Sequence, residues 1–179
     1  SGPININNDH SDAMAVRDAG WLMLFAETNQ EAYDNYLQAM RIGEAVSLPI
    51  MICQDGFITS HAIENIELED TAEVRKFVGE YKPQHYLLNK DEPIAVGPYS
   101  TPVYYMETKR SQAQAMMDAK KVIQDVANEF AAWTGRQYGL IEKYEMDDAE
   151  EAILIIGSSA GTAREAIKQL RAQGKKVGM

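Results

Sequence analysis

The first 80 residues alternate between short apolar runs and segments with helical periodicity. Residues 3–6 alternate in polarity, and residues 21–25 are an apolar run of strand length. Residues 48–53 predict a buried strand that tolerates Pro49 near its start. Strands separated by helix-length segments are typical of βαβ units, so the pattern predicts an α/β fold with a parallel sheet and flanking helices.

Two capping signals predict where helices begin. Thr28-Asn29-Gln30-Glu31 is a capping box. Asp70-Thr71-Ala72-Glu73 is a second signal, which opens a short helix. The apolar stripes expected to face the core are Tyr33, Tyr36, Leu37 and Met40 in the first helix and Val74, Phe77 and Val78 in the second.

The regular pattern stops at Tyr81. Residues 81–105 contain four prolines, Pro83, Pro93, Pro98 and Pro102. We expect residues 81–111 to form an extended strap on a surface or on a partner, because many aromatic and aliphatic residues argue against a disordered linker. A long helix is predicted over 112–134 and ends at Gly135. Its expected apolar stripe is Met116, Ala119, Ile123, Val126, Phe130 and Trp133.

A new unit is predicted after residue 143. It comprises a strand over 152–156, a turn over 157–161, a helix over 162–173 and the next strand over 175–179. We therefore expect a fragment, or one part of an assembly, that carries the end of one α/β domain and the beginning of another. The expected division is residues 1–80 for the first domain, 81–111 for the strap, 112–143 for the helix packed on that domain, and 144–179 for the second domain.

Composition narrows the class of protein. An apolar fraction of 45% permits a real core, and a net charge of −10 disfavours nucleic-acid binding. The single cysteine, Cys53, excludes an internal disulfide and any multi-cysteine metal site made by this sequence alone, and its apolar surroundings predict a buried thiol. The apolar runs are too short to span a membrane, and no basic, apolar leader is found at the start. These features predict a soluble, cytoplasmic protein.

Polar side chains gather where the predicted strands end. Asn8-Asp9-His10-Ser11-Asp12 follows the first strand, and Asp55 and His61 follow the strand over 48–53. Ligands of open parallel sheets bind beyond the carboxyl ends of the strands. The candidates for a site wall are Asn8, Asp9, His10, Asp12 and Arg17, with Asp55 and His61 as secondary candidates. His10 could transfer protons or hydrogen-bond a substrate, and Arg17 could hold a carboxylate.

Structural interpretations compete with these assignments. Ser11 or Asp12 could instead cap a short helix over residues 13–17. From the residues alone, this capping interpretation and the site-wall interpretation are about equally well supported. Asp55-Gly56 fits a plain turn, and the carboxylates beside His10 lack metal-ligand spacing. The turn over 157–161 lacks both the GxGxxG and the GxxxxGK[ST] spacing, so a tight βα turn is favoured over a nucleotide site.

The sequence resembles the 2-oxoacid:ferredoxin oxidoreductases, of which pyruvate:ferredoxin oxidoreductase is the best known. The resemblance covers essentially the whole chain in order. The segments that carry it are Asn8-Asp9-His10-Ser11-Asp12, Ala15-Val16-Arg17-Asp18-Ala19-Gly20-Trp21, Glu31-Ala32-Tyr33-Asp34, Leu48-Pro49, Asp55-Gly56-Phe57 with Ser60-His61, Trp133-Thr134-Gly135-Arg136 with Tyr138, and the final strand–Gly-Ser-Ser–helix unit.

The resemblance implies an anaerobic, oligomeric enzyme with thiamine diphosphate, Mg and [4Fe-4S] clusters. Such an enzyme decarboxylates a 2-oxoacid, passes electrons to ferredoxin and transfers the acyl group to coenzyme A. The chain then corresponds to the α subunit or α region: the later part of the pyrimidine-binding thiamine fold, followed by the start of a transketolase C-terminal-like domain. That second domain is mainly structural in the family, which supports the tight-turn interpretation of residues 157–161.

The resemblance also limits what this chain contains. The family's activating glutamate and a substrate-binding arginine correspond to positions upstream of Ser1, and other domains hold the diphosphate, its metal and the clusters. We therefore expect the chain alone to be inactive, with no metal of its own. Pyruvate is the first substrate expected, with branched-chain 2-oxoacids, 2-oxoglutarate and oxalate open. The alternatives are a non-catalytic assembly or regulatory subunit of the same fold, and a nucleotide-binding module.

Overall fold

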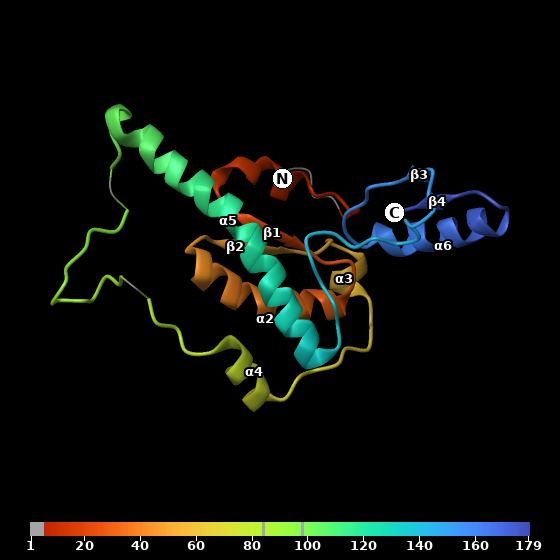
Figure 1. The fold of residues 1–179 in the computed structure, drawn as a ribbon, viewed down its shortest axis with the longest axis horizontal. Coiled ribbons are helices and arrows are strands. Elements are labelled where there is room, and N and C mark those ends of the chain that lie inside the picture. Colours follow the sequence, from red (N-terminus) through yellow and green to blue (C-terminus); the bar gives the residue numbers. More distant parts are fainter. Residues whose placement is uncertain (1–5, 84, 98) are drawn as a thin grey trace.

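The computed structural model describes residues 6–83, 85–97 and 99–179, and its described strands form two parallel pairs (Figure 1). In the first pair, β1 (Leu22–Phe25) runs parallel to β2 (Ile50–Cys53) with Leu22 opposite Ile50. In the second pair, β3 (Glu151–Ala152) runs parallel to β4 (Val177–Gly178). The predicted α/β class with parallel strands is confirmed. Most of the strand predicted over 3–6 lies outside the described residues.

Helices connect and cover the strands. Helix α2 links β1 to β2, and α6 links β3 to β4, so both crossovers are of the βαβ type. The long helix α5 lies across α2 (Figure 1). The bounds are α1 Ser11–Ala15, the 3₁₀ helix η1 Arg17–Ala19, α2 Asn29–Val46, α3 Ile58–His61, α4 Thr71–Val78, α5 Pro102–Thr134 and α6 Ser159–Ala172.

The main core lies where β1, α2 and α5 meet. Its buried members are Leu22, Ile42, Ala119 and Val126. Beside it, the Phe77 and Phe130 rings lie 5.4 Å apart, and Trp133 lies 5.2 Å from Phe77. Both observations confirm the predicted inner face of the long helix, because a stripe repeating every three or four residues meets one neighbour along its length.

The predicted inner face of α2 is wrong at two of its four positions, whereas Tyr33 and Leu37 are partly buried. Tyr36 is 63% exposed and Met40 is 47% exposed. The side chains that are buried instead are Asp34, Asn35, Gln38 and Ile42. The face of α2 that meets α5 is therefore largely polar, which a search for apolar periodicity cannot detect. Burial of these polar groups depends on hydrogen-bond partners from other parts of the chain.

The long helix begins earlier than predicted. It starts at Pro102 rather than at residue 112, so the last ten residues of the expected strap are helical. Proline is favoured at the first helical position, where its missing N–H costs nothing, and Thr101 precedes it as the N-cap. Within the part of the strap that remains, the described residues form neither helix nor strand between Gly79 and Thr101. The side chains of Leu87, Leu88 and Tyr99 are mostly exposed there.

The strand predicted over 152–156 is also shorter than expected. Only Glu151 and Ala152 pair with β4, because β4 itself is only two residues long. Leu154 is 88% exposed. The predicted helix is present as α6, but it begins at Ser159, three residues before the predicted start, whereas its closing glycine agrees with the prediction and Gly174 adopts a φ of 82°. The proposed division into domains stays a prediction.

Both predicted N-caps form hydrogen bonds with the first turn of their helices. The Thr28 hydroxyl accepts a hydrogen bond from the Glu31 amide at 3.2 Å. The Asp70 carboxylate accepts from the Ala72 amide at 2.8 Å and from the Glu73 amide at 3.3 Å. These bonds satisfy backbone donors that the first turn of a helix leaves without partners.

Removing the Asp70 cap is expected to loosen α4. Asp70→Ala should lower the free energy of opening of this helix by about 1 kcal/mol, because two amide donors lose their acceptor. Hydrogen exchange at the Ala72 and Glu73 amides of the intact protein would measure the change. Asp70→Asn is the matched control, since asparagine caps equally well and should leave the exchange rates nearly unchanged.

None of the helices in the described part of the chain combines the length and apolarity needed to cross a bilayer. Cys53 is a buried free thiol at the end of β2, as predicted. Burial raises the pKa of this thiol, and the nearby charge of Asp12 raises it further. The thiol is therefore a packing group and not an activated nucleophile.

Candidate functional site

The N-terminal polar loop reaches the carboxyl edge of the first strand pair and meets the turn before α6 (Figure 1). The Asn8 amide nitrogen donates to the Ser159 hydroxyl at 2.8 Å and lies 3.5 Å from the Ser158 hydroxyl. The His10 ring packs edge-on against Phe25, the last residue of β1, with centroids 5.1 Å apart. Segments about 150 residues apart in the sequence thus build one polar corner.

Two buried polar atoms in this corner lack a hydrogen-bond partner among the described residues. They are Nε2 of His10 and Oδ2 of Asp55. Asp55 is 3% exposed, and its other carboxylate oxygen accepts from the Thr59 amide at 2.8 Å. Buried polar groups are almost always paired, so an unpaired one suggests a place for water or a ligand.

Asp55 is held in its charged form. Burial would raise the pKa of its carboxyl group, but the neighbouring Ser158 hydroxyl and the Thr59, Ile58 and Phe57 amides together lower this pKa below its ordinary value. The carboxylate is therefore an acceptor near neutral pH. The residue predicted as part of a plain turn is instead buried beside Ser158, in the same corner as His10.

The turn before α6 packs tightly on the polar loop. Gly157 has a φ of 79°, and a Cβ atom at this position would lie 2.8 Å from Nε2 of His10. The backbone conformation therefore favours glycine, and an added methyl group would displace the end of the His10 side chain. The tight-turn prediction agrees with the backbone, but the sequence carried no sign that this turn would contact the N-terminal loop.

The predicted site residues separate into three groups. Asn8, His10 and Asp55 surround the corner formed with Ser158. Asp12 lies at the start of α1, where its carboxylate accepts from the Ala13 amide at 2.7 Å, and the Asp9 carboxylate accepts from the Ser11 amide at 2.9 Å. These two acidic residues thus shape the loop backbone.

The contacts of the other two candidates are local. Arg17 is exposed and pairs with Asp18 at 3.5 Å. The His61 ring stacks on Phe57 at 5.6 Å, and its Nδ1 lies 2.7 Å from the Ser60 hydroxyl. The capping alternative is only partly right: the short helix exists, but its N-cap residue is His10 and not Ser11 or Asp12.

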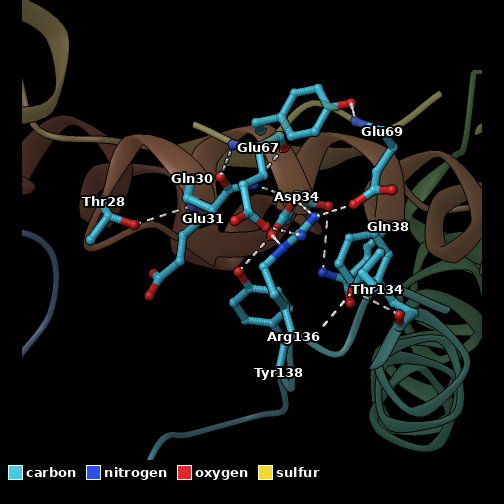
Figure 2. Close-up of polar contacts among 12 residues, drawn as sticks. Thr28, Gln30, Glu31, Asp34, Gln38, Glu67, Glu69, Thr134, Arg136 and Tyr138 are labelled. Atoms are coloured by element: carbon cyan, nitrogen blue, oxygen red, sulfur yellow. Dashed lines mark hydrogen bonds and ion pairs between the residues drawn. The ribbon is translucent and has the colours of Figure 1, made fainter. Parts of the chain in front are cut away.

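A second polar cluster, the Asp34 network, crosses the core (Figure 2). Asp34 is fully buried and accepts from Arg136 Nε at 2.6 Å, from Arg136 Nη2 at 3.0 Å and from the Tyr138 hydroxyl at 2.7 Å. Arg136 also donates to Glu69 at 2.8 Å, and the Gln30 amide donates to Asp34 at 3.0 Å. The bidentate arrangement is the strong geometry for an arginine–carboxylate pair.

The Asp34 network explains the largely polar inner face of α2. Hydrogen bonding to Asp34 raises the pKa of Arg136, and burial followed by the bond to Asp34 raises the pKa of Tyr138. The network ties α2 to the chain after α5 and to the chain before α4. Because its hydrogen-bond capacity is used internally, we assign it to the stability of the fold and not to the site.

A third cluster lies between β1 and α6. The carboxylates of Glu27, Glu31 and Glu142 lie within 4.8 Å of one another. Arg164 of α6 donates to Glu142 at 2.8 Å and to Glu27 at 3.1 Å, so it balances part of their charge. Burial, together with the neighbouring carboxylates, raises the pKa of Glu31 to about 7.

The raised pKa of Glu31 makes stability depend on pH. The folded protein holds this proton more tightly than the unfolded chain, so the contribution is fully present below pH 4.5 and is lost as the pH rises through about 7. The loss is expected to be on the order of 1–2 kcal/mol, reduced by solvent screening of a half-buried group. Glu31→Gln should remove this dependence while keeping an acceptor for the Glu27 amide.

Thermal unfolding of the wild type and of Glu31→Gln between pH 5 and 8 would measure this effect. The variant should gain stability relative to the wild type as the pH increases. Parallel curves over that range would contradict the assignment.

A polar corner at the carboxyl edge of parallel strands is the arrangement that α/β enzymes use to bind ligands. Residues 1–128 match the family described as pyruvate flavodoxin/ferredoxin oxidoreductase, thiamine diphosphate-binding. The chain belongs to this family, which confirms the resemblance found in the sequence.

Named relatives agree with this membership. The chain is 49% identical over 180 residues to pyruvate synthase subunit PorA of Thermotoga maritima, covering 99% of this chain and 46% of the relative. It is 45% identical to the same subunit of Methanocaldococcus jannaschii, covering 100% and 47%. It is 41% identical to ketoisovalerate oxidoreductase subunit VorA of Pyrococcus abyssi, covering 98% and 45%. The chain thus spans about half the length of these relatives.

Proposed function

We propose that this chain is part of a 2-oxoacid:ferredoxin oxidoreductase, which oxidatively decarboxylates a 2-oxoacid and transfers the acyl group to coenzyme A. The observation that carries the proposal is family membership over residues 1–128, together with likeness to pyruvate synthase subunits along nearly the whole chain. Pyruvate is the proposed substrate, because these two pyruvate synthase subunits are more similar to the chain than the ketoisovalerate subunit is. A branched-chain 2-oxoacid is the second proposed substrate, because one relative is a ketoisovalerate oxidoreductase subunit.

The polar corner fits the role of a site wall. Nε2 of His10 is buried beside Gly157 without a hydrogen-bond partner among the described residues, and the Asn8 amide nearby lies 3.5 Å from the Ser158 hydroxyl. We propose that His10 orients the substrate or the uncharged part of the cofactor by hydrogen bonding. Asp55 contributes a negative charge at the same edge. That charge favours donor groups of the ligand beside it, so we place the carboxylate of the 2-oxoacid away from Asp55.

The cofactors are proposed to be held largely by other parts of the enzyme. When bound, thiamine diphosphate supplies the carbanion stabilisation that decarboxylation requires. The charge of Asp55 would repel its diphosphate, so we place the diphosphate and its Mg against another domain. Iron–sulfur clusters need several cysteine ligands, and this sequence contains one cysteine, so the [4Fe-4S] clusters belong to other segments or subunits.

The partners follow from the same reaction. We propose that the chain associates with the remaining subunits or domains of the oxidoreductase, and that the complete enzyme uses ferredoxin as electron acceptor and coenzyme A as acyl acceptor in the cytoplasm. The net charge of −10 disfavours a nucleic-acid partner.

Anaerobic purification of the complete enzyme from its own cells would test the proposal. We expect bound iron and thiamine diphosphate, and viologen reduction that requires coenzyme A and one 2-oxoacid. The panel comprises pyruvate, 2-oxoisovalerate, 2-oxoglutarate and oxalate, and pyruvate is expected to give the highest kcat/KM. A complex with neither cofactor and no activity would contradict the proposal and favour a non-catalytic assembly role.

A further inference from the structure

The β3–α6–β4 unit meets the proposed site through the Gly157-Ser158-Ser159 turn. Asn8 donates to Ser159 at 2.8 Å, and the approach of Gly157 to His10 leaves no room for a side chain. The other contact of the His10 ring is the edge of Phe25 in β1. The imidazole is thus held by a strand of one unit and a turn of the other.

A separate ion pair fixes α6 in this place. Arg164, which follows Ser159 on the same helix, pairs with Glu27 at 3.1 Å, directly after β1. Its guanidinium also lies 5.0 Å from the Tyr144 ring. The helix α6 is therefore attached to the segment after β1 through Arg164 and Glu27, and to the N-terminal loop through Ser159 and Asn8.

The turn also borders a buried polar atom without a partner in the described part of the chain. That atom is Nε2 of His10, and a Cβ atom at Gly157 would lie 2.8 Å from it.

We propose that Gly157, Ser158 and Ser159 are positioning residues, which set the place of the His10 imidazole in the site of the oxidoreductase. The second α/β unit is then more than a structural support, because it holds the wall of the site. This inference rests on the proposed function. It adds that the position of the His10 side chain relative to the substrate depends on Gly157, about 150 positions away in the sequence.

Gly157→Ala in the assembled enzyme tests the proposal. The new methyl group must displace the far end of the His10 side chain. Misplacing a group that orients a substrate lowers kcat/KM steeply, and we expect a decrease between about tenfold and a hundredfold. Assembly, iron content and thiamine content should stay as in the wild type.

Two glycines, one within α6 and one just after it, provide matched controls. Gly174 has a φ of 82°, and a Cβ atom added there would meet no other atom within 4 Å, so Gly174→Ala reproduces the backbone strain without the collision. Gly161 has open space and no positive φ, so Gly161→Ala reproduces the added methyl group alone. Both controls should keep kcat/KM within about twofold of the wild type, a change of less than about 0.5 kcal/mol.

A double-mutant cycle tests whether Gly157→Ala lowers kcat/KM by acting on His10. In a His10→Ala background, Gly157→Ala should cause little further loss of kcat/KM, because the side chain that it displaces is gone. Ser159→Ala removes the hydrogen bond from Asn8 without adding bulk, and it should also lower kcat/KM. This variant replaces Gly157→Ala as the test if the Gly157→Ala enzyme does not assemble.

The outcomes separate the two proposals. A wild-type enzyme without 2-oxoacid-dependent activity would overturn the proposed function. An active wild type in which Gly157→Ala and Ser159→Ala behave like the control variants would overturn the positioning role alone. Additive losses in the cycle would also overturn it, because they would show that the turn does not act through His10.

Discussion

Asp34→Ala is expected to lower the free energy of unfolding of the intact subunit by about 3–5 kcal/mol, the largest stability effect expected for this protein. The substitution would leave the half-buried Arg136 guanidinium without its bidentate partner and the Tyr138 hydroxyl without its acceptor. Urea or thermal unfolding monitored by circular dichroism would measure the loss.

The matched control for Asp34 is another acidic partner of the same arginine. Glu67 approaches Arg136 at 3.4 Å, but its side chain is 84% exposed, so Glu67→Ala should change stability by no more than about 0.5 kcal/mol. Equal losses from the two substitutions would contradict the view that burial makes the Asp34 network important. If Asp34→Ala instead lowered the activity without lowering the free energy of unfolding, the Asp34 network would be assigned to the functional site.

His10→Ala is expected to lower kcat/KM of the assembled enzyme for its 2-oxoacid by about a hundredfold, the largest effect on activity. A positioned hydrogen-bonding or proton-transferring side chain contributes to rate on this order. His10 is the candidate whose ring nitrogen is buried and unpaired, among the described residues, at the strand edge. Steady-state viologen reduction with the proposed substrate would measure the change.

His85→Ala provides the comparison, because His85 is exposed in the strap and takes no part in this corner. It should leave kcat/KM unchanged. If His10→Ala instead prevents assembly while the remaining enzyme keeps normal turnover, the N-terminal loop is an interface and not a site wall.

Local features of this protein were accessible from the sequence. The caps at Thr28 and Asp70 form as predicted, because each depends on residues two or three positions apart. The strands at residues 22–25 and 50–53 and their parallel pairing also agree, because apolar runs of that length joined by a helix allow few other arrangements. The start of α5 was missed because Pro102 favours both an extended strap and the first turn of a helix.

The functional arrangement depends on contacts that no sequence period encodes. Asp34 and Arg136 were both within segments that carry the family resemblance, but only the folded chain joins them across 102 positions. The polar loop was a candidate from its place after a strand, yet nothing near it indicated Ser159 as its partner across 151 positions.

The division between the two kinds of information has a physical origin. Propensity, capping and hydrophobic alternation act over a few residues, so the sequence by itself determined the fold class, the helix starts at the two caps and the set of candidate residues. Which polar groups are buried together depends on how the units pack, because a buried charge or amide is stable only beside a partner brought by the tertiary structure. Only that structure showed that the Asn8 side chain meets Ser159 and that Nε2 of His10 is buried against Gly157.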